Sequence, residues 1–380
     1  MRPIILKVGW NDATTGPLLP AIQAHYGIDF IVVSMLFVSN CVGFLTAAVL
    51  NISLTDQLGL GKLILLGAVF QVLAYTLMVP TLPFPITIAY AINGLGIGFQ
   101  DAQANGFIAG LPNNTSEKMG LLHAVYGAGA FISPLVATQF AQRPRWSFHY
   151  LTSLGLSVTN AVVLFTVFKL RRQDGKARLV QQTEGPETPV SNGKYKEIFS
   201  SRAVQLVAFF IWLYVGLEFI IDERGGGPSA GYISSGFFGG LMLGRIVLLW
   251  VNEKIGERRV VYIYCILCVA LELVIWLVPN LIGNAVAVSF VGLLLAESPL
   301  YPIAMNATGA IVPKRFGQAG SAVFPFLTGA LAEKHSVKVL QPLVVGMIVA
   351  LVVLWTLIPA GQKRQEGSPE PKPRSVPKRG

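Results

Sequence analysis

Apolar runs of about 18 to 25 residues recur along nearly the whole chain, and they constrain its fold more than any other feature. At a rise of about 1.5 Å per residue, a helix of that length crosses a hydrocarbon core about 30 Å thick. The runs are continuous rather than alternating, which argues against the strands of a membrane barrel. Charged residues make up only 13% of the chain, against about 25% in soluble domains. The sequence therefore predicts an all-α polytopic membrane protein.

We expect twelve membrane-spanning helices, of which the first is short of apolar residues. They are expected at residues 3–25, 29–50, 63–80, 84–110, 119–141, 148–170, 203–221, 231–251, 260–278, 281–312, 316–332 and 338–358. No cleavable signal peptide is expected, because residues 1–10 lack the charged start, the long apolar core and the small-residue cleavage site of such a peptide.

The net charge of +10 gathers on one side of the expected bundle. Most Lys and Arg residues fall in loops after even-numbered spans and in the C-terminal tail, and the loop 171–201 holds the largest group. By the positive-inside rule, both termini and this loop face the cytosol. The charge therefore reports membrane orientation. We expect a monomer in the lipid bilayer, in the plasma membrane, with no nucleic-acid partner.

A polar segment divides the chain into two halves. Residues 171–201 are rich in Gln, Gly, Pro, Glu and Lys, a composition typical of a flexible linker. We therefore expect an N-terminal six-helix half over 1–170, a cytosolic linker over 171–201, a C-terminal six-helix half over 202–360 and a disordered basic tail over 361–380.

An internal repeat relates the two halves. The stretch TDQLGLGKLILLG, from Thr55, has a counterpart shifted by 197 residues, NEKIGERRVVYIY, from Asn252. Each has an acid, a Gly three residues later and a basic residue three further on, between the second and third spans of its half. Such a turn can hold two helix ends together by charge and hydrogen bonding at a cytosolic gate. The alternative is a tight turn between helices, which needs Gly and favours charged residues. The gate candidates, with one arginine deep in a span, are Asp56, Gly59, Lys62, Arg245, Glu253, Gly256 and Arg259.

The fourth expected span carries polar residues within one of the most apolar regions. Every fourth residue is small, which lets another helix approach closely: Gly94, Gly98, Ala102, Gly106 and Gly110. The other side carries a polar ladder with two flanking amides: Asn93, Asp101, Asn105, Gln100 and Gln103. An acid at mid-membrane costs about 3 kcal/mol, so it should face a cavity or a partner. The ladder predicts a proton-coupling carboxylate beside a substrate site; the alternative is a buried acid satisfied by a neighbouring helix.

Two six-helix halves, a central cytosolic loop and the same charged turn in both halves resemble the major facilitator superfamily of secondary transporters. The turn matches in part, because Ile52 and Gln57 stand where that family has Gly and Arg. The resemblance implies alternating access of two halves around a midplane site.

A narrower resemblance is to the fucose/proton symporter-like branch of that superfamily. QDAQANGF, from Gln100 to Phe107, is similar to the E-T-A-A-N-P-F segment of its fourth span, with Asp101 at the coupling glutamate and Asn105 at the Asn. GWNDATTGPLLP, LLHAVYGAGAFISPL and GGPSAGYISSGFFGGLMLGR are similar to uncharacterised fungal members, and this likeness runs over nearly the whole chain. The resemblance implies proton-coupled transport of a small polar solute such as a sugar.

The candidate site residues fall into two groups. Those expected to carry protons are Asp101, His123, Asp12 and Glu218. Those expected to bind substrate are Asn93, Gln100, Asn105, Asn11, Tyr126, Tyr214, Tyr301 and Asn306. For Asn11 and Asp12 the alternative is an exposed polar N-terminus. For His123 it is a plain hydrogen bond in the bundle, for Glu218 a place at the membrane surface, and for Arg245 a structural salt bridge with an acid such as Glu253.

No metal site, cofactor or enzyme activity is expected. Cys265 and Cys268 form a C-x-x-C pair without a His or a second Cys pair nearby, which favours apolar packing over zinc. The chain has no H-E-x-x-H and no G-x-S-x-G motif. Compared with the branch it resembles, the chain looks shortened in spans 1, 7 and 10–11, so the alternative function is a non-transporting or receptor-like membrane paralogue.

Overall fold

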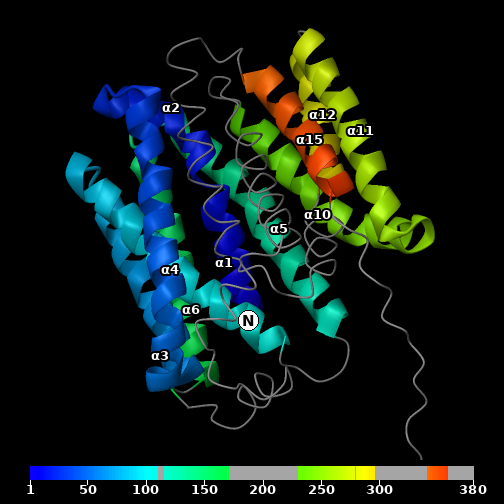
Figure 1. Cartoon of the computed structure of the whole chain (residues 1–380). Helices are drawn as coiled ribbons and strands as arrows, with labels where there is room; N and C mark the ends of the chain where they lie inside the picture. Colours follow the sequence, from blue (N-terminus) through cyan, green and yellow to red (C-terminus); the bar gives the residue numbers. More distant parts are fainter. Residues whose placement is uncertain (110–114, 169, 171–229, 279, 296–339, 358–380) are drawn as a thin grey trace, which may run out of the picture.

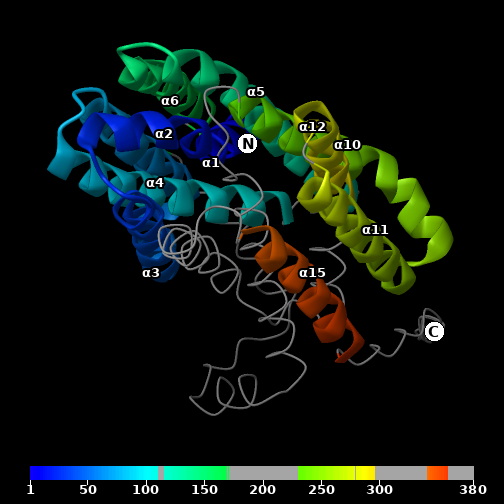
Figure 2. The same ribbon diagram turned by 90° about the horizontal axis from the view of Figure 1, so that it is seen from above.

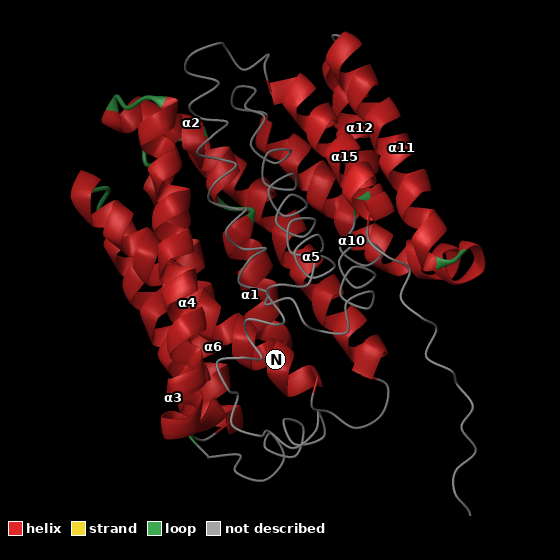
Figure 3. Cartoon of the chain, viewed as in Figure 1, coloured by secondary structure: helices red, strands yellow, loops and turns green. Residues whose placement is uncertain are grey.

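The computed structural model describes the whole chain except residues 110–114, 169, 171–229, 279, 296–339 and 358–380. Every regular element of the described part is a helix (Figure 3). The first group consists of α1 (Arg2–Asp12), α2 (Thr15–Tyr26), α3 (Phe30–Met78), α4 (Pro83–Ala109), α5 (Thr115–Ala141), the short 3-10 helix η1 (Trp146–Phe148) and α6 (His149–Phe168). The second group consists of α10 (Ala230–Ile255), α11 (Glu257–Leu277), α12 (Leu281–Leu294) and α15 (Leu340–Leu357). The expected all-α class is confirmed.

The two groups of helices meet where α5 lies against α10 (Figures 1 and 2). On its other side α5 packs against α1, while α3 packs along α4 and α6. In the second group, α12 packs against both α10 and α11, and α15 packs against α11. The helix α5 thus stands between α1 of the first group and α10 of the second.

Six stretches of the described helices are long and apolar enough to cross a membrane: Ile31–Asn51, Gln57–Met78, Leu121–Ala141, Trp146–Phe168, Gly231–Leu248 and Arg259–Leu277. Their outward sides expose large apolar side chains, such as Val162, Ile246 and Ile266. Water would penalise such a surface, whereas lipid tails match it. The expected spans over 203–221 and 316–332, and the later part of 281–312, lie outside the described residues.

The first expected span is two helices with a break immediately after Asp12. Pro17 lies in the first turn of α2; its ring has no N–H and would clash with the carbonyl of Ala13 in a continuous helix. The alternative of an exposed polar N-terminus is wrong, because Lys7 is 2% and Asn11 is 8% exposed. The polar groups of α1 that precede the break therefore lie inside the bundle.

The glycine of the repeated turn has a positive φ in both groups. Gly59, where the long helix α3 is interrupted, has φ 74° and ψ 164°. Gly256, between α10 and α11, has φ 91° and ψ 134°. These angles lie in or near a region that only glycine adopts without strain, so the predicted need for Gly is confirmed. Lys62 and Arg259 are exposed, while the side chains of Asp56 and Glu253 lie outside the described part, so their role in a gate stays a prediction.

Gly59→Ala and Gly256→Ala are each expected to lower the free energy of unfolding by about 1 to 3 kcal/mol, because a Cβ strains the backbone at these angles. The measurement is the thermal unfolding of the purified protein in detergent. Gly346→Ala in α15 is the matched control, since an added Cβ there meets nothing within 4 Å. Equal unfolding temperatures for all three variants would contradict the prediction.

Reciprocal glycines bring three pairs of helices into backbone contact. A Cβ at Gly43 in α3 would overlap the carbonyl of Ala91 in α4, and one at Gly94 would overlap the carbonyl of Asn40 in α3. The pair α10 and α12 repeats this arrangement with Gly240 against Ser289 and Gly292 against Phe237. The pair α1 and α5 uses Gly9 against Tyr126 and Gly129 against Leu6. Gly43 and Gly240 are 197 residues apart, so the sequence repeat extends to helix packing.

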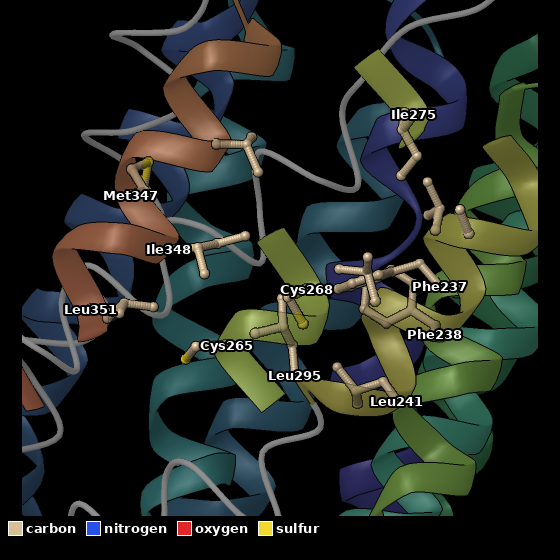
Figure 4. Packing of buried hydrophobic residues seen from close by; sticks show 14 of the residues in the cluster. Phe237, Phe238, Leu241, Cys265, Cys268, Ile275, Leu295, Met347, Ile348 and Leu351 are labelled. Carbon is tan, nitrogen blue, oxygen red and sulfur yellow. The ribbon is translucent and has the colours of Figure 1, made fainter. Parts of the chain in front are cut away.

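An apolar core, part of which Figure 4 shows, lies largely within the second group and extends to Ala13 and Ala130 of the first. It brings together Phe237, Phe238 and Leu241 of α10, Cys265 and Cys268 of α11, and Met347, Ile348 and Leu351 of α15. Both cysteine thiols are free and buried, which confirms their expected role in apolar packing. Among the described residues, no group of three or more His, Cys, Asp or Glu side chains is placed to hold a metal ion.

Candidate functional site

A hydrogen-bond network joins α1 to α3, α4 and α5 around Asn11. The Oδ1 atom of Asn11 accepts from Oη of Tyr75 at 2.8 Å and from Nδ2 of Asn93 at 2.5 Å. Its Nδ2 atom donates to Oδ1 of Asp12 at 3.2 Å. The break after Asp12 lets the carboxylate turn to α5, where Oη of Tyr126 donates to Oδ2 at 2.9 Å. The structure therefore brings together four predicted site residues: Asn11, Asp12, Asn93 and Tyr126.

A second polar chain runs from a lysine that sequence reasoning missed. Nζ of Lys7, a residue 2% exposed, donates to Oε1 of Gln71 and lies 5.1 Å from the ring centroid of Tyr75. The same Gln71 oxygen accepts from Nε2 of Gln100 at 2.8 Å, and Oε1 of Gln100 accepts from Nδ2 of Asn160 at 2.8 Å. The sequence does contain a pattern that indicates this contact. Lys7 precedes Asn11 by four residues and Gln71 precedes Tyr75 by four, so each pair lies on one face of its helix. The two chains are therefore stacked along α1 and α3.

The polar side chains of the predicted ladder on α4 contact different helices. Nδ2 of Asn105 donates to Oδ1 of Asp101 at 2.7 Å, within the helix. Asn93 instead contacts α1, and Gln103 donates to Asn51 and Thr55 of α3 at 2.8 Å each. Asn93, Gln103 and Asn105 are buried, while Asp101 is half-buried. Asn93 and Asp101 thus share a ladder in the sequence but have separate contacts in the fold.

The small-residue stripe of α4 packs over part of its length. Gly94 and Gly98 face Asn40, Phe44 and Ala47 of α3 closely, as expected. Gly106 is exposed, and a Cβ there would meet nothing within 4 Å. The expectation of close helix contact is therefore wrong at Gly106, because this glycine lies on an exposed side of α4 that no described helix covers.

Arg245 on α10 reaches the first group of helices. It is 2% exposed; its Nη1 atom donates to the main-chain oxygen of His123 at 2.5 Å. Its guanidinium carbon lies 5.1 Å from the ring centroid of Tyr126. Gly127 makes room for this contact, because Met242 of α10 lies directly against it. Pairing of Arg245 with Glu253 stays a prediction.

Buried aromatic residues form a cluster beside this network. Oη of Tyr90 lies 3.2 Å from Oγ1 of Thr15 and 3.2 Å from Oη of Tyr150. The rings of Tyr75 and Tyr150 are stacked at 6.4 Å. Sequence reasoning missed these tyrosines, since aromatic residues of an apolar span carry no signal that separates a polar contact from core packing.

Four predicted site residues lie outside the described part of the chain: Glu218, Tyr214, Tyr301 and Asn306. The imidazole of His123 is half-buried on α5, near the helix end expected to face the cytosol. Its role in proton transfer stays a prediction. What the described residues offer chemically is a carboxylate facing two neutral donors, a set of amides and hydroxyls, and two buried basic side chains, Lys7 and Arg245.

A family model described as "Major Facilitator Superfamily" matches residues 5–315. Among curated proteins, "Bypass of stop codon protein 6" of Saccharomyces cerevisiae is 26% identical over 406 residues, covering 94% of this chain and 81% of that protein. The "Glucose/mannose transporter GlcP" of Bacillus subtilis is 21% identical, covering 91% of this chain and 90% of that protein. The first alignment is longer than the 380-residue chain, so it includes residues of the relative that have no counterpart here.

Among solved structures, the partially occluded inward-open xylose transporter XylE from E. coli matches with a TM-score of 0.69 at 12% identity, covering 94% of this chain and 96% of that one. A crystal structure of a D-xylose-proton symporter matches with a TM-score of 0.68 at 11% identity, covering 95% and 97%. At such low identity the likeness concerns the fold, and it agrees with the predicted arrangement of two halves.

Proposed function

Since this chain belongs to the major facilitator superfamily and is an integral multi-pass membrane protein, we propose that it is a secondary active transporter of a small polar solute, driven by protons. The observation that carries the proposal is the polar network of α1, α3, α4 and α5 around Asn11 and Asp12. Burying polar groups inside a membrane costs free energy, so a cluster of them within a helix bundle indicates a functional site. The names of the similar proteins support a sugar as the solute to test first.

In this proposal, Asp12 and Asp101 exchange protons while amides and hydroxyls of α1 and α4 bind the solute. A proton on Asp12 occupies one of the two oxygens that accept from Asn11 and Tyr126. A proton on Oδ1 of Asp101 competes with Asn105, and one on Oδ2 weakens that oxygen as an acceptor. Each protonation therefore changes a hydrogen bond within the polar region. Further contacts come, in the proposal, from the predicted residues outside the described part.

The proposed topology has both termini and the linker 171–201 in the cytosol, with halves over 1–170 and 202–360 and a basic tail over 361–380. The excess of Lys and Arg in the corresponding loops supports it. The proposed location is the plasma membrane and the proposed state is a monomer.

Uptake of labelled glucose, mannose and xylose into proteoliposomes tests the function. We expect accumulation of at least one of them when the outside is acid, and a loss of this gradient dependence in Asp101→Asn and Asp12→Asn. Asp29→Asn is the matched control: Asp29 caps α3 by accepting from the main-chain nitrogen of Val32, and Asn serves equally well as a cap. Uptake that ignores the gradient, or that survives both substitutions unchanged, contradicts proton coupling.

The alternative is a membrane protein that binds its solute without moving it. The long alignment with the yeast protein favours it, because residues present there have no counterpart in this chain. Saturable binding of a sugar to the purified protein, with no uptake at any gradient, would support the alternative over transport.

A further inference from the structure

A chain of three side chains connects α10 to α1 through α5. Arg245 of α10 lies over the ring of Tyr126 of α5, with 5.1 Å between guanidinium carbon and ring centroid. The hydroxyl of Tyr126 donates to Oδ2 of Asp12 at 2.9 Å. The main-chain oxygen of His123, one turn before Tyr126, also accepts from Arg245. A cation of one helix group is thus linked to an acid of the other by a single aromatic ring.

The charge of Asp12 acts on Arg245 in two ways. A phenol that donates to a carboxylate gains electron density, and a cation is held more strongly over an electron-rich ring. The negative charge also attracts the guanidinium directly, and a low-dielectric interior weakens that attraction little. A neutral Asp12 removes the charge behind both effects and becomes a weaker acceptor for the Tyr126 hydroxyl.

We propose that Arg245, Tyr126 and Asp12 form a latch between the two groups of helices, held by the negative charge of Asp12 and loosened when that charge is lost. The inference rests on the proposed transport function for its purpose, since a transporter needs the protonation state of one half to influence its contact with the other. The latch itself is a property of the contacts and can be measured without any solute.

The surroundings of Asp12 support this assignment. The charged and titratable groups on the elements packed around α1 include Lys7 on α1 itself, Tyr75 on α3, Tyr126 on α5, His149 on α6 and, beyond the Tyr126 ring, Arg245 on α10. Lys7 contacts Gln71 and the ring of Tyr75. Tyr75 donates to Asn11. Tyr126 is therefore one described group through which Asp12 reaches the second group of helices.

Distances between the two helix groups test the latch. Spin labels are attached to Gln57→Cys and Lys254→Cys, exposed positions at the two repeated turns, in a chain whose buried Cys41, Cys265 and Cys268 are replaced by alanine. Double electron–electron resonance in lipid nanodiscs then reports the ratio of wide to narrow separations. Arg245→Gln is expected to raise that ratio roughly 2- to 30-fold, the range that loss of a cation–π contact implies. Asp12→Asn and Tyr126→Phe weaken the contact but keep an aromatic ring under the guanidinium, so each should raise the ratio by a smaller factor.

A double-substitution cycle separates the latch from general loosening. With Asp12→Asn in place, Tyr126→Phe should add little, because the negative charge that the Tyr126 hydroxyl passes to its ring is already gone. Tyr232→Phe is the control: Gln139 of α5 donates to the Tyr232 hydroxyl of α10, so its effect should be equal with and without Asp12→Asn. An unchanged ratio in Asp12→Asn, or additive effects of Asp12→Asn and Tyr126→Phe, would overturn the proposal.

Both single variants at Asp12 and Tyr126 keep the size of the side chain, so they are expected to fold. If Arg245→Gln does not purify as a monodisperse species, Arg245→Lys replaces it, since lysine keeps the charge and loses the planar contact. A latch without sugar uptake would refute the proposed transport alone, and uptake without distance changes would refute the latch alone.

Discussion

Gly94→Ala is expected to lower the free energy of unfolding by about 1 to 3 kcal/mol, and Gly94→Leu by more. An added Cβ overlaps the main-chain oxygen of Asn40 in α3, and the backbone of a packed helix cannot move aside as a flexible side chain can. Either α3 and α4 separate, with the loss of contacts along both, or the helix bends. The measurement is the thermal unfolding temperature in one detergent at fixed protein concentration.

Gly155→Ala in α6 is the matched control for that experiment. An added Cβ there meets nothing within 4 Å, and alanine favours a helix over glycine by about 1 kcal/mol. The same chemical change should therefore stabilise one helix and destabilise the other. If Gly94→Ala unfolds at the same temperature as Gly155→Ala or above it, α3 and α4 are not in backbone contact at this point.

Asn11→Leu is expected to be the most damaging single change in the polar network. Its side-chain oxygen accepts from both Tyr75 and Asn93, so a leucine leaves two buried donors without an acceptor. Hydrogen bonds inside membrane bundles contribute about 0.6 kcal/mol on average and about 1.7 kcal/mol at most. Loss of two bonds should therefore cost about 1 to 3 kcal/mol of unfolding free energy, again read from thermal unfolding.

The comparison for Asn11→Leu is Asn51→Leu on α3. Asn51 accepts from Nε2 of Gln103, and the same nitrogen also donates to Thr55. Gln103 therefore keeps an acceptor when Asn51 is replaced. A loss of stability in Asn51→Leu as large as that in Asn11→Leu would show that the number of stranded donors does not decide the cost.

The helices themselves were predictable because their signals are local. Length and hydropathy located the spans that the structure describes. Pro17 indicated a break near Asp12, because proline disrupts a continuous helix. The repeat located Gly59 and Gly256, since a positive φ leaves a mark in the sequence as a glycine at a fixed offset. These features depend on neighbours within a few residues, which a single sequence contains.

The partners of the polar residues were less predictable, because they depend on which helices touch. Asn11, Asp12, Asn93 and Tyr126 were selected one helix at a time, and only the fold shows that they bond to one another. Lys7 was missed because it lies in an apolar stretch near the start of the chain, where a basic residue usually needs no explanation. Its burial follows from α1 being enclosed by neighbouring helices, α5 above all.

The position of α5 between α1 and α10 suggests a way to trap the protein in a single conformation. Gly129 contacts Leu6 of α1, whereas Gly127 contacts Met242 of α10. Larger side chains at these two positions, only two residues apart, would therefore disturb different helix interfaces. A bulky residue at Gly129 would separate α5 from α1 within the first group. A bulky residue at Gly127 would separate α5 from α10, at the contact between the two groups. Such a pair gives a route to conformationally trapped samples for antibody selection or imaging.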